Sequence, residues 1–470
     1  MNHKLARFFL LSFTVLAGLT PFSARAEEKV IELCPKLAEE DTYKDQKDFK
    51  WMVAGKDGWI FRTDYDLKQD EYELSDWASG SFKRLNEVLG KRGTTLVVSI
   101  NPTRGLVGHP ALLPPYDKDY DLKKAQAGYE KLIDMFSETG IITANSKDAG
   151  TVSGFFLKRD NHWTAVGAKY MAQKVADAVK ANPVYASLKK AEFVTTEAPA
   201  EEGKQANDNF LEFIEETCGK MPESETIKTI YTTSRKDIGD VAQALLGEQA
   251  EAPEVVLWGT SNSTEPEPSH ANFAGFLKEY LSADVNNASV QGGSIRGAIG
   301  SYVLTGQYDT QKPKVALWEL SAHYGLDQDE LFREMIPAIY GDCSDEEAIA
   351  TASGQLEADQ EGTVILKDLA AKSIFSRNYF VSLELENKDI REIAIHFVHD
   401  GDKKDKVKLE RSVRNFPENP GKFYSELHYN IDKPLKEVRL QAEAKGSAYK
   451  AKICKMDLTL PVKAEDSVTD

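Results

Sequence analysis

The stretch Thr94-Thr-Leu-Val-Val-Ser-Ile100 decides the fold, because it is an unbroken run of β-branched, aliphatic and small residues. Such a run is typical of a strand buried on both faces of a sheet. Residues 254–258 and 313–320 are two further largely apolar runs that we expect to be buried strands, and residues 121–139 and 164–180 have the periodicity of helices. Buried runs separated by helical patterns predict an α/β domain with a parallel sheet and helices on both faces.

Two short motifs fall in loops of this expected domain. Asp160 and His162 stand just before the helix expected at 164–180, and Ser261 follows the run 254–258 in Gly259-Thr-Ser. A carboxylate can hold one imidazole nitrogen and leave the other facing a hydroxyl. A serine at a strand-to-helix turn exposes its hydroxyl beside free backbone N–H groups. We therefore expect an acyl-transfer triad in which His162 is the general base, Asp160 fixes its tautomer and Ser261 becomes acylated.

Both motifs also have plainer interpretations. An Asp-x-His pair can simply cap a helix, or supply two metal ligands. The other histidines after residue 26 are scattered and form no second ligand pair near His162, so we expect no metal and no cofactor. Ser263 and Ser269 are rival nucleophiles, but neither lies directly at the strand end. The Ser261 amide is the expected oxyanion donor, and a second donor is unassigned.

Four residues of the same domain are candidates for holding an acidic sugar. Arginine binds carboxylates through two parallel hydrogen bonds. Arg104 leaves the end of the run 94–100, and Arg296 and Tyr302 follow Gly292-Gly293. Tyr324 is the fourth candidate. An ordinary salt bridge or core packing explains each of them equally well.

The charge of the chain is unevenly distributed. The formal net charge is −17, yet residues 362–463 carry 20 Lys and Arg against 15 Asp and Glu. A basic region on an acidic protein indicates an anionic partner, and we expect an acidic polysaccharide, not nucleic acid. Lys404, Lys406 and Lys408 would line up on one face of a strand, where carboxylates could bridge them. A charged edge that discourages strand aggregation explains these lysines equally well.

The composition changes near residue 346. Residues 346–362 are polar and acidic and are expected to form a linker. Beyond them, short alternating runs at 379–385, 393–398, 406–413, 423–431 and 437–443 predict a β-sandwich. We therefore expect a catalytic domain at 27–345, with a charged insertion at 195–235, and a β-sandwich domain at 346–470.

The beginning of the chain has the pattern of a signal peptide. Lys4 and Arg7 precede an apolar stretch at 8–19, and Ala24-Arg25-Ala26 is a small-x-small cleavage site. We expect residues 1–26 to be removed on export. No later stretch has the roughly 20 apolar residues of a membrane span, so the protein is expected not to span a membrane.

Four cysteines lie in the part that is expected to be exported, where disulfides form. They allow three pairings. We expect Cys34–Cys218 and Cys343–Cys454, because each pair then closes one domain without crossing the other. No Cys-x-x-Cys occurs, which argues against a zinc knuckle or a thioredoxin-type role.

The order of five motifs resembles the alginate O-acetyltransferase family. The motifs are Gly55-Lys-Asp-Gly-Trp-Ile-Phe61, Asn101-Pro-Thr-Arg104, Asp160-Asn-His-Trp163, Gly259-Thr-Ser261 and Gly292-Gly293. The resemblance implies an SGNH-hydrolase-like domain with permuted motif order, because the Asp/His element precedes the serine. It also implies a C-terminal carbohydrate-binding module, and its triad positions match Asp160, His162 and Ser261.

The activity that this resemblance implies is acetyl transfer to mannuronate hydroxyls of alginate in the periplasm. The implied partners are alginate, acetyl-donor proteins and periplasmic or outer-membrane components of alginate export. Two alternatives stay open. A carbohydrate acetylesterase would have the same triad with water as acceptor, and a non-catalytic scaffold of an export complex would depend on charged faces instead.

Overall fold

The computed structural model describes residues 30–46, 49–70, 72, 74–206, 209–236, 252–265, 270–357, 362–374, 377–428, 433–443 and 446–459. The expected signal peptide at 1–26, the rival nucleophile Ser269 and the acidic tail at 464–470 lie outside the described residues. Within the described part, no helix has the length and apolar character needed to cross a bilayer.

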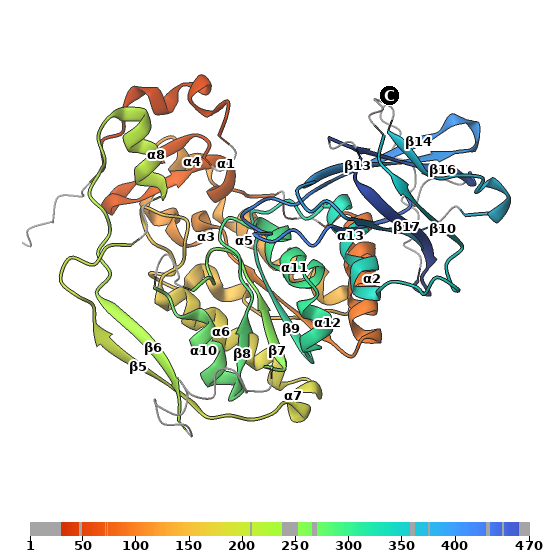
Figure 1. The fold of residues 1–470 in the computed structure, drawn as a ribbon. Coiled ribbons are helices and arrows are strands. Elements are labelled where there is room, and N and C mark those ends of the chain that lie inside the picture. The colour runs from red at the N-terminus through yellow and green to blue at the C-terminus, as the bar shows by residue number, and fades with distance from the viewer. Residues whose placement is uncertain are drawn as a thin grey trace, which may run out of the picture.

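A five-stranded parallel sheet forms the centre of the larger domain (Figure 1). Its order is β4-β3-β9-β7-β8, and the bounds are β3 Thr95–Asn101, β4 Ile142–Thr143, β7 Val255–Trp258, β8 Val285–Asn287 and β9 Val315–Ser321. All residues of β7 and β9 are buried, as their apolar runs require. The predicted α/β architecture with a parallel sheet is confirmed.

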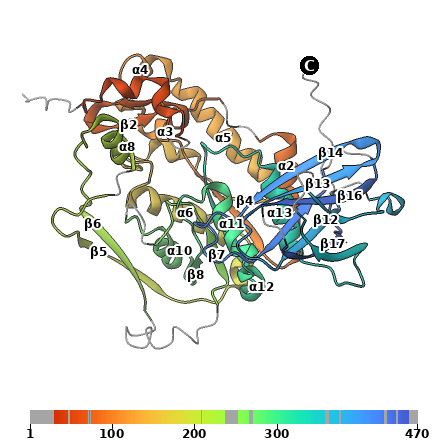
Figure 2. The ribbon, with the colours of Figure 1, turned by 45° about the horizontal axis from the view of Figure 1, so that its top comes forward.

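Helices cover both faces of this sheet. The helices α6 and α10 pack against each other beside it, and α2 and α13 pack against each other on the side of the second domain (Figures 1 and 2). Side chains of Ser75, Asp121 and Thr164 accept hydrogen bonds from the first-turn amides of α2, α5 and α6, which fixes where these helices begin. The longer helices are α2 Asp76–Lys91, α5 Leu122–Glu138, α6 Ala165–Lys180, α8 Asn209–Cys218, α10 Phe273–Leu281, α11 Ser294–Leu304 and α13 Asp329–Tyr340.

Short helices fill the connections. The α-helical turns are α1 Thr63–Asp66, α3 Arg104–Gly108, α4 Tyr116–Asp119, α7 Val184–Ser187 and α12 Gln307–Gln311. The 3-10 turns are η1 Pro35–Ala38, η2 Glu40–Tyr43, η3 Lys56–Gly58, η4 His109–Ala111, η5 Lys147–Thr151, η6 Ala370–Lys372 and η7 Asp400–Asp402.

The polar stretch expected as an insertion at 195–235 is structured. A two-stranded antiparallel ribbon, β5 Phe193–Pro199 and β6 Thr229–Arg235, extends along the side of α10. Between its strands, α8 buries Phe210 and Ile214 against the N-terminal hairpin of β1 Met52–Ala54 and β2 Ile60–Arg62. The expected disulfide Cys34–Cys218 joins α8 to this N-terminal region and is confirmed.

The C-terminal region is a sandwich of two four-stranded antiparallel sheets around one apolar core. The sheet orders are β10-β17-β12-β15 and β11-β16-β13-β14, with bounds β10 Ala350–Gln355, β11 Thr363–Leu366, β12 Tyr379–Leu385, β13 Glu392–His399, β14 Lys404–Glu410, β15 Lys422–Glu426, β16 Leu435–Ala442 and β17 Ala448–Lys455. The β-sandwich prediction is confirmed, but the linker expected at 346–362 was wrong. Part of that stretch is the edge strand β10, whose residues are mostly small and carry little apolar signal.

The two domains are joined by buried ion pairs and a disulfide. Arg84 of α2 contacts Glu426 of β15 at 2.8 Å, and Arg333 of α13 pairs with Asp405 of β14. Arg84, Arg333 and Glu426 are at most 2 % exposed. The expected Cys343–Cys454 disulfide is confirmed, but the reason given for it was wrong, because the bond links the end of the α/β domain to β17 and so joins two domains. The domain limit at 345/346 stays a prediction.

Candidate active site

The carboxyl ends of three sheet strands meet at one edge of the α/β domain. Asn101, the last residue of β3, pairs with Ser321, the last residue of β9, and Trp258 ends β7 beside Trp318. In an open parallel sheet, the loops at this edge line the functional site. The loop that carries Ser261 leaves this edge.

The structure brings the three expected triad residues together. His162 Nε2 lies 2.9 Å from Ser261 Oγ, and His162 Nδ1 is hydrogen-bonded to Asp160 Oδ1. Asp160 and His162 are each 1 % exposed, whereas Ser261 is only partly buried. With the Nδ1 proton donated to Asp160, His162 Nε2 can accept the Ser261 hydroxyl proton, as a serine nucleophile requires.

Asp160 is held as an anion by its surroundings. Burial by itself raises the pKa of the Asp160 carboxyl. The nearby His162, the hydrogen bonds from its ring and amide, and Arg104 lower the pKa by more than burial raises it, so the net pKa lies below the ordinary 3.8. The amide of Asn209 also donates to Asp160 Oδ2, at 3.2 Å. Asp160 therefore remains ionised at neutral pH.

The lowered pKa of Asp160 predicts a specific acid response of the fold. A carboxyl group whose folded pKa is depressed contributes stability above its unfolded pKa, and that contribution is lost as the pH falls through the folded pKa. Wild-type protein should therefore lose its stability advantage over Asp160→Asn below pH 3.8, the ordinary value. Thermal unfolding midpoints of both proteins between neutral and strongly acidic pH test this. A difference between the two unfolding midpoints that stays constant over the whole pH range would contradict this prediction.

The backbone N–H groups from Thr260 to Ser263 differ in whether they have an acceptor among the described residues. The amide of Thr260 donates to Glu319, and the amides of Asn262 and Ser263 donate to the hydroxyl and carbonyl oxygens of Thr260. Within the described residues, the Ser261 amide has no acceptor. An amide in this position can stabilise the oxyanion of a tetrahedral intermediate. The rival Ser263 is fully buried and its hydroxyl donates to Glu319, at 3.2 Å.

A direct link holds the serine turn against the histidine loop. Asn262 Oδ1 accepts from the Trp163 amide at 3.1 Å, and the Asn262 carbonyl accepts from the Trp163 indole N–H at 2.8 Å. Trp163 is fully buried and Asn262 is 5 % exposed. These residues directly follow His162 and Ser261, so the two hydrogen bonds hold the loops of His162 and Ser261 against each other. The sequence indicated neither contact, because both hydrogen bonds join loops that are about a hundred residues apart in the chain.

Two of the expected sugar ligands are buried. Arg104 is 2 % exposed and donates to Asp66 and to the carbonyl oxygens of Leu157 and Lys158, which precede the loop of Asp160 and His162. Tyr302 is 1 % exposed and its hydroxyl donates to Gln311. Burial of both side chains favours structural roles over direct contact with a sugar, and Arg104 supports the chain segment that leads to Asp160.

The structure places Tyr324 in the loop after β9, at the edge of the sheet from which the Ser261 loop also leaves. Its ring is partly buried and lies 4.5 Å from that of His323. Tyr324 therefore stays a predicted sugar ligand.

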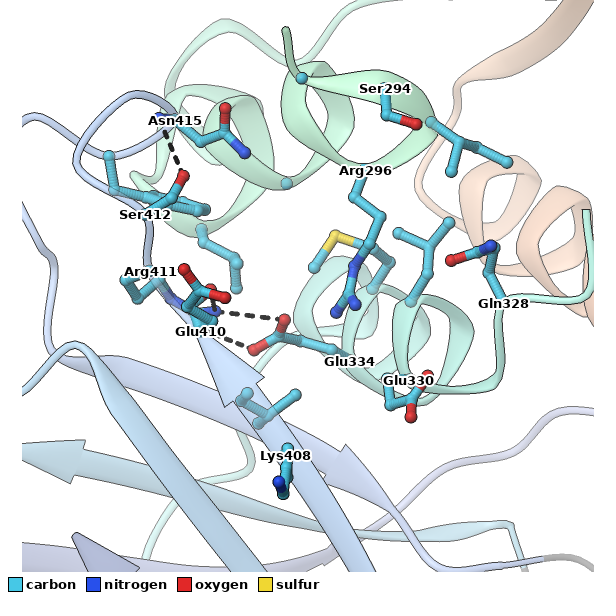
Figure 3. Close-up of a pocket in the computed structure, with 18 of the residues that line it drawn as sticks. Ser294, Arg296, Gln328, Glu330, Glu334, Lys408, Glu410, Arg411, Ser412 and Asn415 are labelled. Atoms are coloured by element: carbon cyan, nitrogen blue, oxygen red, sulfur yellow. Dashed lines mark hydrogen bonds and ion pairs between the residues drawn. The ribbon is translucent and has the colours of Figure 1, made fainter. Parts of the chain in front are cut away.

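Arg296 and Lys408 face a pocket of about 420 Å³ between the domains (Figure 3). Arg296 projects from α11 and Lys408 from β14, and the buried pair Glu334–Arg411 forms another part of the wall. Within the described residues, Arg296 has no ion-pair partner. Carboxylates also line the pocket, which therefore carries charges of both signs. The structure thus brings together two expected sugar ligands from different domains.

The three lysines of β14 share one exposed face, as their spacing requires. Lys404, Lys406 and Lys408 are exposed and alternate with the buried Val407 and Leu409. β14 is the edge strand of its sheet. Both interpretations of these lysines, polymer contact and protection of an edge, fit this geometry.

Comparison with known proteins identifies the family. The model of the family described as "SGNH hydrolase-like domain, acetyltransferase AlgX" matches residues 52–322, which contain the sheet and all three triad residues. The chain belongs to this family. It therefore carries an acetyltransferase-type SGNH hydrolase-like domain, and the expected family resemblance is confirmed.

Relatives of the AlgX family match over nearly the whole chain. The alginate biosynthesis protein AlgX of Pseudomonas syringae pv. tomato is 27% identical, with 92% of this chain and 90% of that protein covered. AlgX of Pseudomonas aeruginosa is 28% identical, with 93% and 90% covered. A solved structure of Pseudomonas aeruginosa AlgX covers 90% of this chain and 100% of its own, at 25% identity and a TM-score of 0.77. The similarity thus includes the β-sandwich.

Proposed function

We propose that this protein transfers acetyl groups to mannuronate hydroxyls of alginate in the periplasm, through an acetyl-Ser261 intermediate. The hydrogen bond of 2.9 Å between His162 Nε2 and Ser261 Oγ carries the proposal, since it joins a nucleophile to a base oriented by Asp160. Membership of the AlgX family and the names of its alginate biosynthesis relatives support the substrate. Two disulfides and the expected signal peptide support an oxidising, exported location.

The first half-reaction acylates the serine. Ser261 Oγ attacks the carbonyl carbon of an acetyl donor while His162 Nε2 takes the hydroxyl proton, and the Ser261 amide donates to the oxyanion that forms. The tetrahedral intermediate then collapses, the bond to the leaving group breaks, and His162 returns the proton to the leaving group. Asp160 stabilises the imidazolium between these two steps.

The second half-reaction transfers the acetyl group to a sugar. A mannuronate hydroxyl gives its proton to His162 Nε2 and attacks the acetyl carbon, and Ser261 Oγ leaves and regains the proton. Water in place of the sugar would make the protein an acetylesterase. The triad is the same in both cases, so the acceptor of the acetyl group decides whether the protein is a transferase or an esterase.

The acceptor is tested with an activated acetyl ester such as 4-nitrophenyl acetate. The protein is incubated with the ester, with and without mannuronate oligomers, and free acetate and acetylated sugar are measured. We expect the oligomers to divert acetyl groups from water to sugar. Acetate release without any acetylated sugar would contradict the proposed transfer and favour the esterase.

We further propose that the β-sandwich binds the polymer and that acetyl-donor proteins and alginate export components are partners. Lys404, Lys406 and Lys408 form a row of exposed lysines on β14, and Lys408 also lines the interdomain pocket. A bound polymer would then have a high effective concentration at the active site.

Replacing Lys404 and Lys406 together with glutamine should weaken binding of long polymannuronate about tenfold, because two of the cations that contact the polymer are lost while the triad is untouched. Acetyl transfer to a single mannuronate unit should be unchanged. Polymer affinity measured at two salt concentrations, with Lys450→Gln on β17 as control, checks this. Unchanged polymer affinity would leave the lysines as protection of a strand edge.

A further inference from the structure

Glu319 is a buried carboxylate that the triad does not use. It lies on β9, is 1 % exposed, and within the described residues has no cationic partner. Its oxygens instead accept four hydrogen bonds, from Asn101 Nδ2 (2.6 Å) on Oε1 and from the Thr260 amide (2.7 Å), the Thr260 hydroxyl (2.8 Å) and the Ser263 hydroxyl (3.2 Å) on Oε2. Burying an acidic group without a cation is costly, so this position calls for an explanation.

Three of these hydrogen bonds end on the turn that carries the nucleophile. Thr260 and Ser263 flank Ser261, and both are held by the single oxygen Oε2 of Glu319. The Thr260 hydroxyl also accepts from the Asn262 amide at 3.2 Å. Asn262 is hydrogen-bonded in turn to Trp163, the residue after His162. A continuous network therefore runs from Glu319 to both catalytic loops.

We propose that Glu319 is the positioning residue of the acyl-transfer site. Its carboxyl group anchors the turn of Ser261 to the central strand and, through Thr260, Asn262 and Trp163, sets the distance from Ser261 Oγ to His162 Nε2. This inference rests on the proposed role of Ser261 as nucleophile. Glu319 does not touch the reacting atoms.

The network also decides which amide of the turn faces an oxyanion. Glu319 engages the Thr260 amide, and the Thr260 hydroxyl and carbonyl engage those of Asn262 and Ser263, which leaves the Ser261 amide open. Without the anchor, the turn can rotate and lose both the open amide and the contact with His162. A displacement of about 1 Å in a catalytic group can cost about a hundredfold in rate.

Two substitutions of Glu319 distinguish the effect of its hydrogen bonds from the effect of its side-chain volume. Glu319→Leu keeps approximate volume but removes both acceptor oxygens. Glu319→Gln keeps one oxygen for Thr260 and Ser263, and its NH₂ group can face Asn101, whose Oδ1 is buried and has no hydrogen-bond partner among the described residues. Burial raises the pKa of Glu319 although its hydrogen bonds lower it, so a neutral side chain of the same shape suits the site.

Labelling of Ser261 by phenylmethylsulfonyl fluoride, followed by mass spectrometry, measures the nucleophile without any acceptor sugar. The reaction joins Ser261 Oγ to sulfur and releases fluoride. We expect Glu319→Leu to be labelled about a hundredfold more slowly, and Glu319→Gln less than tenfold more slowly. With an acetyl ester, kcat should fall in the same order while KM stays within twofold, because the substrate contacts are unaffected.

Glu426→Gln is the matched control, because it neutralises a buried carboxylate at the domain interface outside this network. It should lower thermal stability without slowing Ser261 labelling. Thr260→Val removes one link of the network and leaves Glu319 in place, so it carries the test if Glu319→Leu does not fold. Its labelling should be about tenfold slower.

A folded Glu319→Leu protein that is labelled at the wild-type rate would overturn the inference. Equal losses in Glu319→Gln and Glu319→Leu would also overturn it, because a restored acceptor would then restore nothing. Should Glu319→Leu not fold, wild-type labelling of Thr260→Val would overturn it. Wild-type protein in which Ser261 is never labelled would instead refute the proposed function itself.

Discussion

Replacing Ser261 with alanine is expected to reduce acetyl transfer to alginate by roughly 10⁴-fold to 10⁶-fold, because the acetyl-serine intermediate can no longer form. The residual rate would come from substrate binding and oxyanion stabilisation alone. Transfer of acetyl groups from an activated ester to mannuronate oligomers measures the effect. His162→Ala should be equally inactive, and the double variant no worse than either single variant, since the residues act as a unit.

A matched serine supplies the control for this experiment. Ser301 lies on α11 and donates only to the Ala298 carbonyl in its own helix, so Ser301→Ala should transfer at the wild-type rate. If Ser261→Ala retains wild-type transfer, the acyl-enzyme mechanism is refuted and the non-catalytic scaffold becomes the better hypothesis. Ser261→Ala should retain its affinity for the polymer.

Replacing Glu426 with glutamine is expected to cause the largest loss of stability. Glu426 is fully buried and faces Arg84 at 2.8 Å and Arg377 at 3.6 Å, and both arginines are almost fully buried. Removing one partner from a buried ion pair leaves uncompensated charge and typically costs about 3–5 kcal/mol. Denaturant unfolding followed by circular dichroism measures the change.

An exposed ion pair provides the comparison for Glu426. Asp70 and Lys124 pair at the surface, where both side chains are more than half exposed, so Asp70→Asn should leave the unfolding midpoint unchanged. If Glu426→Gln were equally neutral, the interface ions would contribute nothing to holding the domains together, and apolar packing and the Cys343–Cys454 bond would remain as the source of their attachment.

The sequence alone was sufficient for the architecture, and it singled out the three side chains that the structure brings together as a candidate triad. Short runs rich in β-branched residues, such as 94–100, favour buried strands, and the carboxyl ends of parallel strands share one edge. Ser261 was therefore expected at that edge before any contact was known. The Asp160–His162 pair is local in the chain, so its geometry needed no long-range information.

The rest depended on contacts that leave no local pattern. β10 consists mainly of small residues and exists because β17 offers it hydrogen bonds. Arg104 resembled a ligand because it follows a strand end, yet Asp66, distant in sequence, makes it a buried ion-pair partner. Glu319 was hidden inside an apolar run, and only the positions of Asn101 and Thr260 reveal why an acid is tolerated there.

The buried ion pairs and the disulfide between the domains have a consequence for how a long sugar chain would be modified. Buried ion pairs attach the β-sandwich to α2 and α13, and a disulfide joins the two domains covalently. A polymer bound by Lys404, Lys406 and Lys408 would then reach Ser261 at a fixed distance from the lysines. The spacing of acetyl groups along the product would reflect that distance.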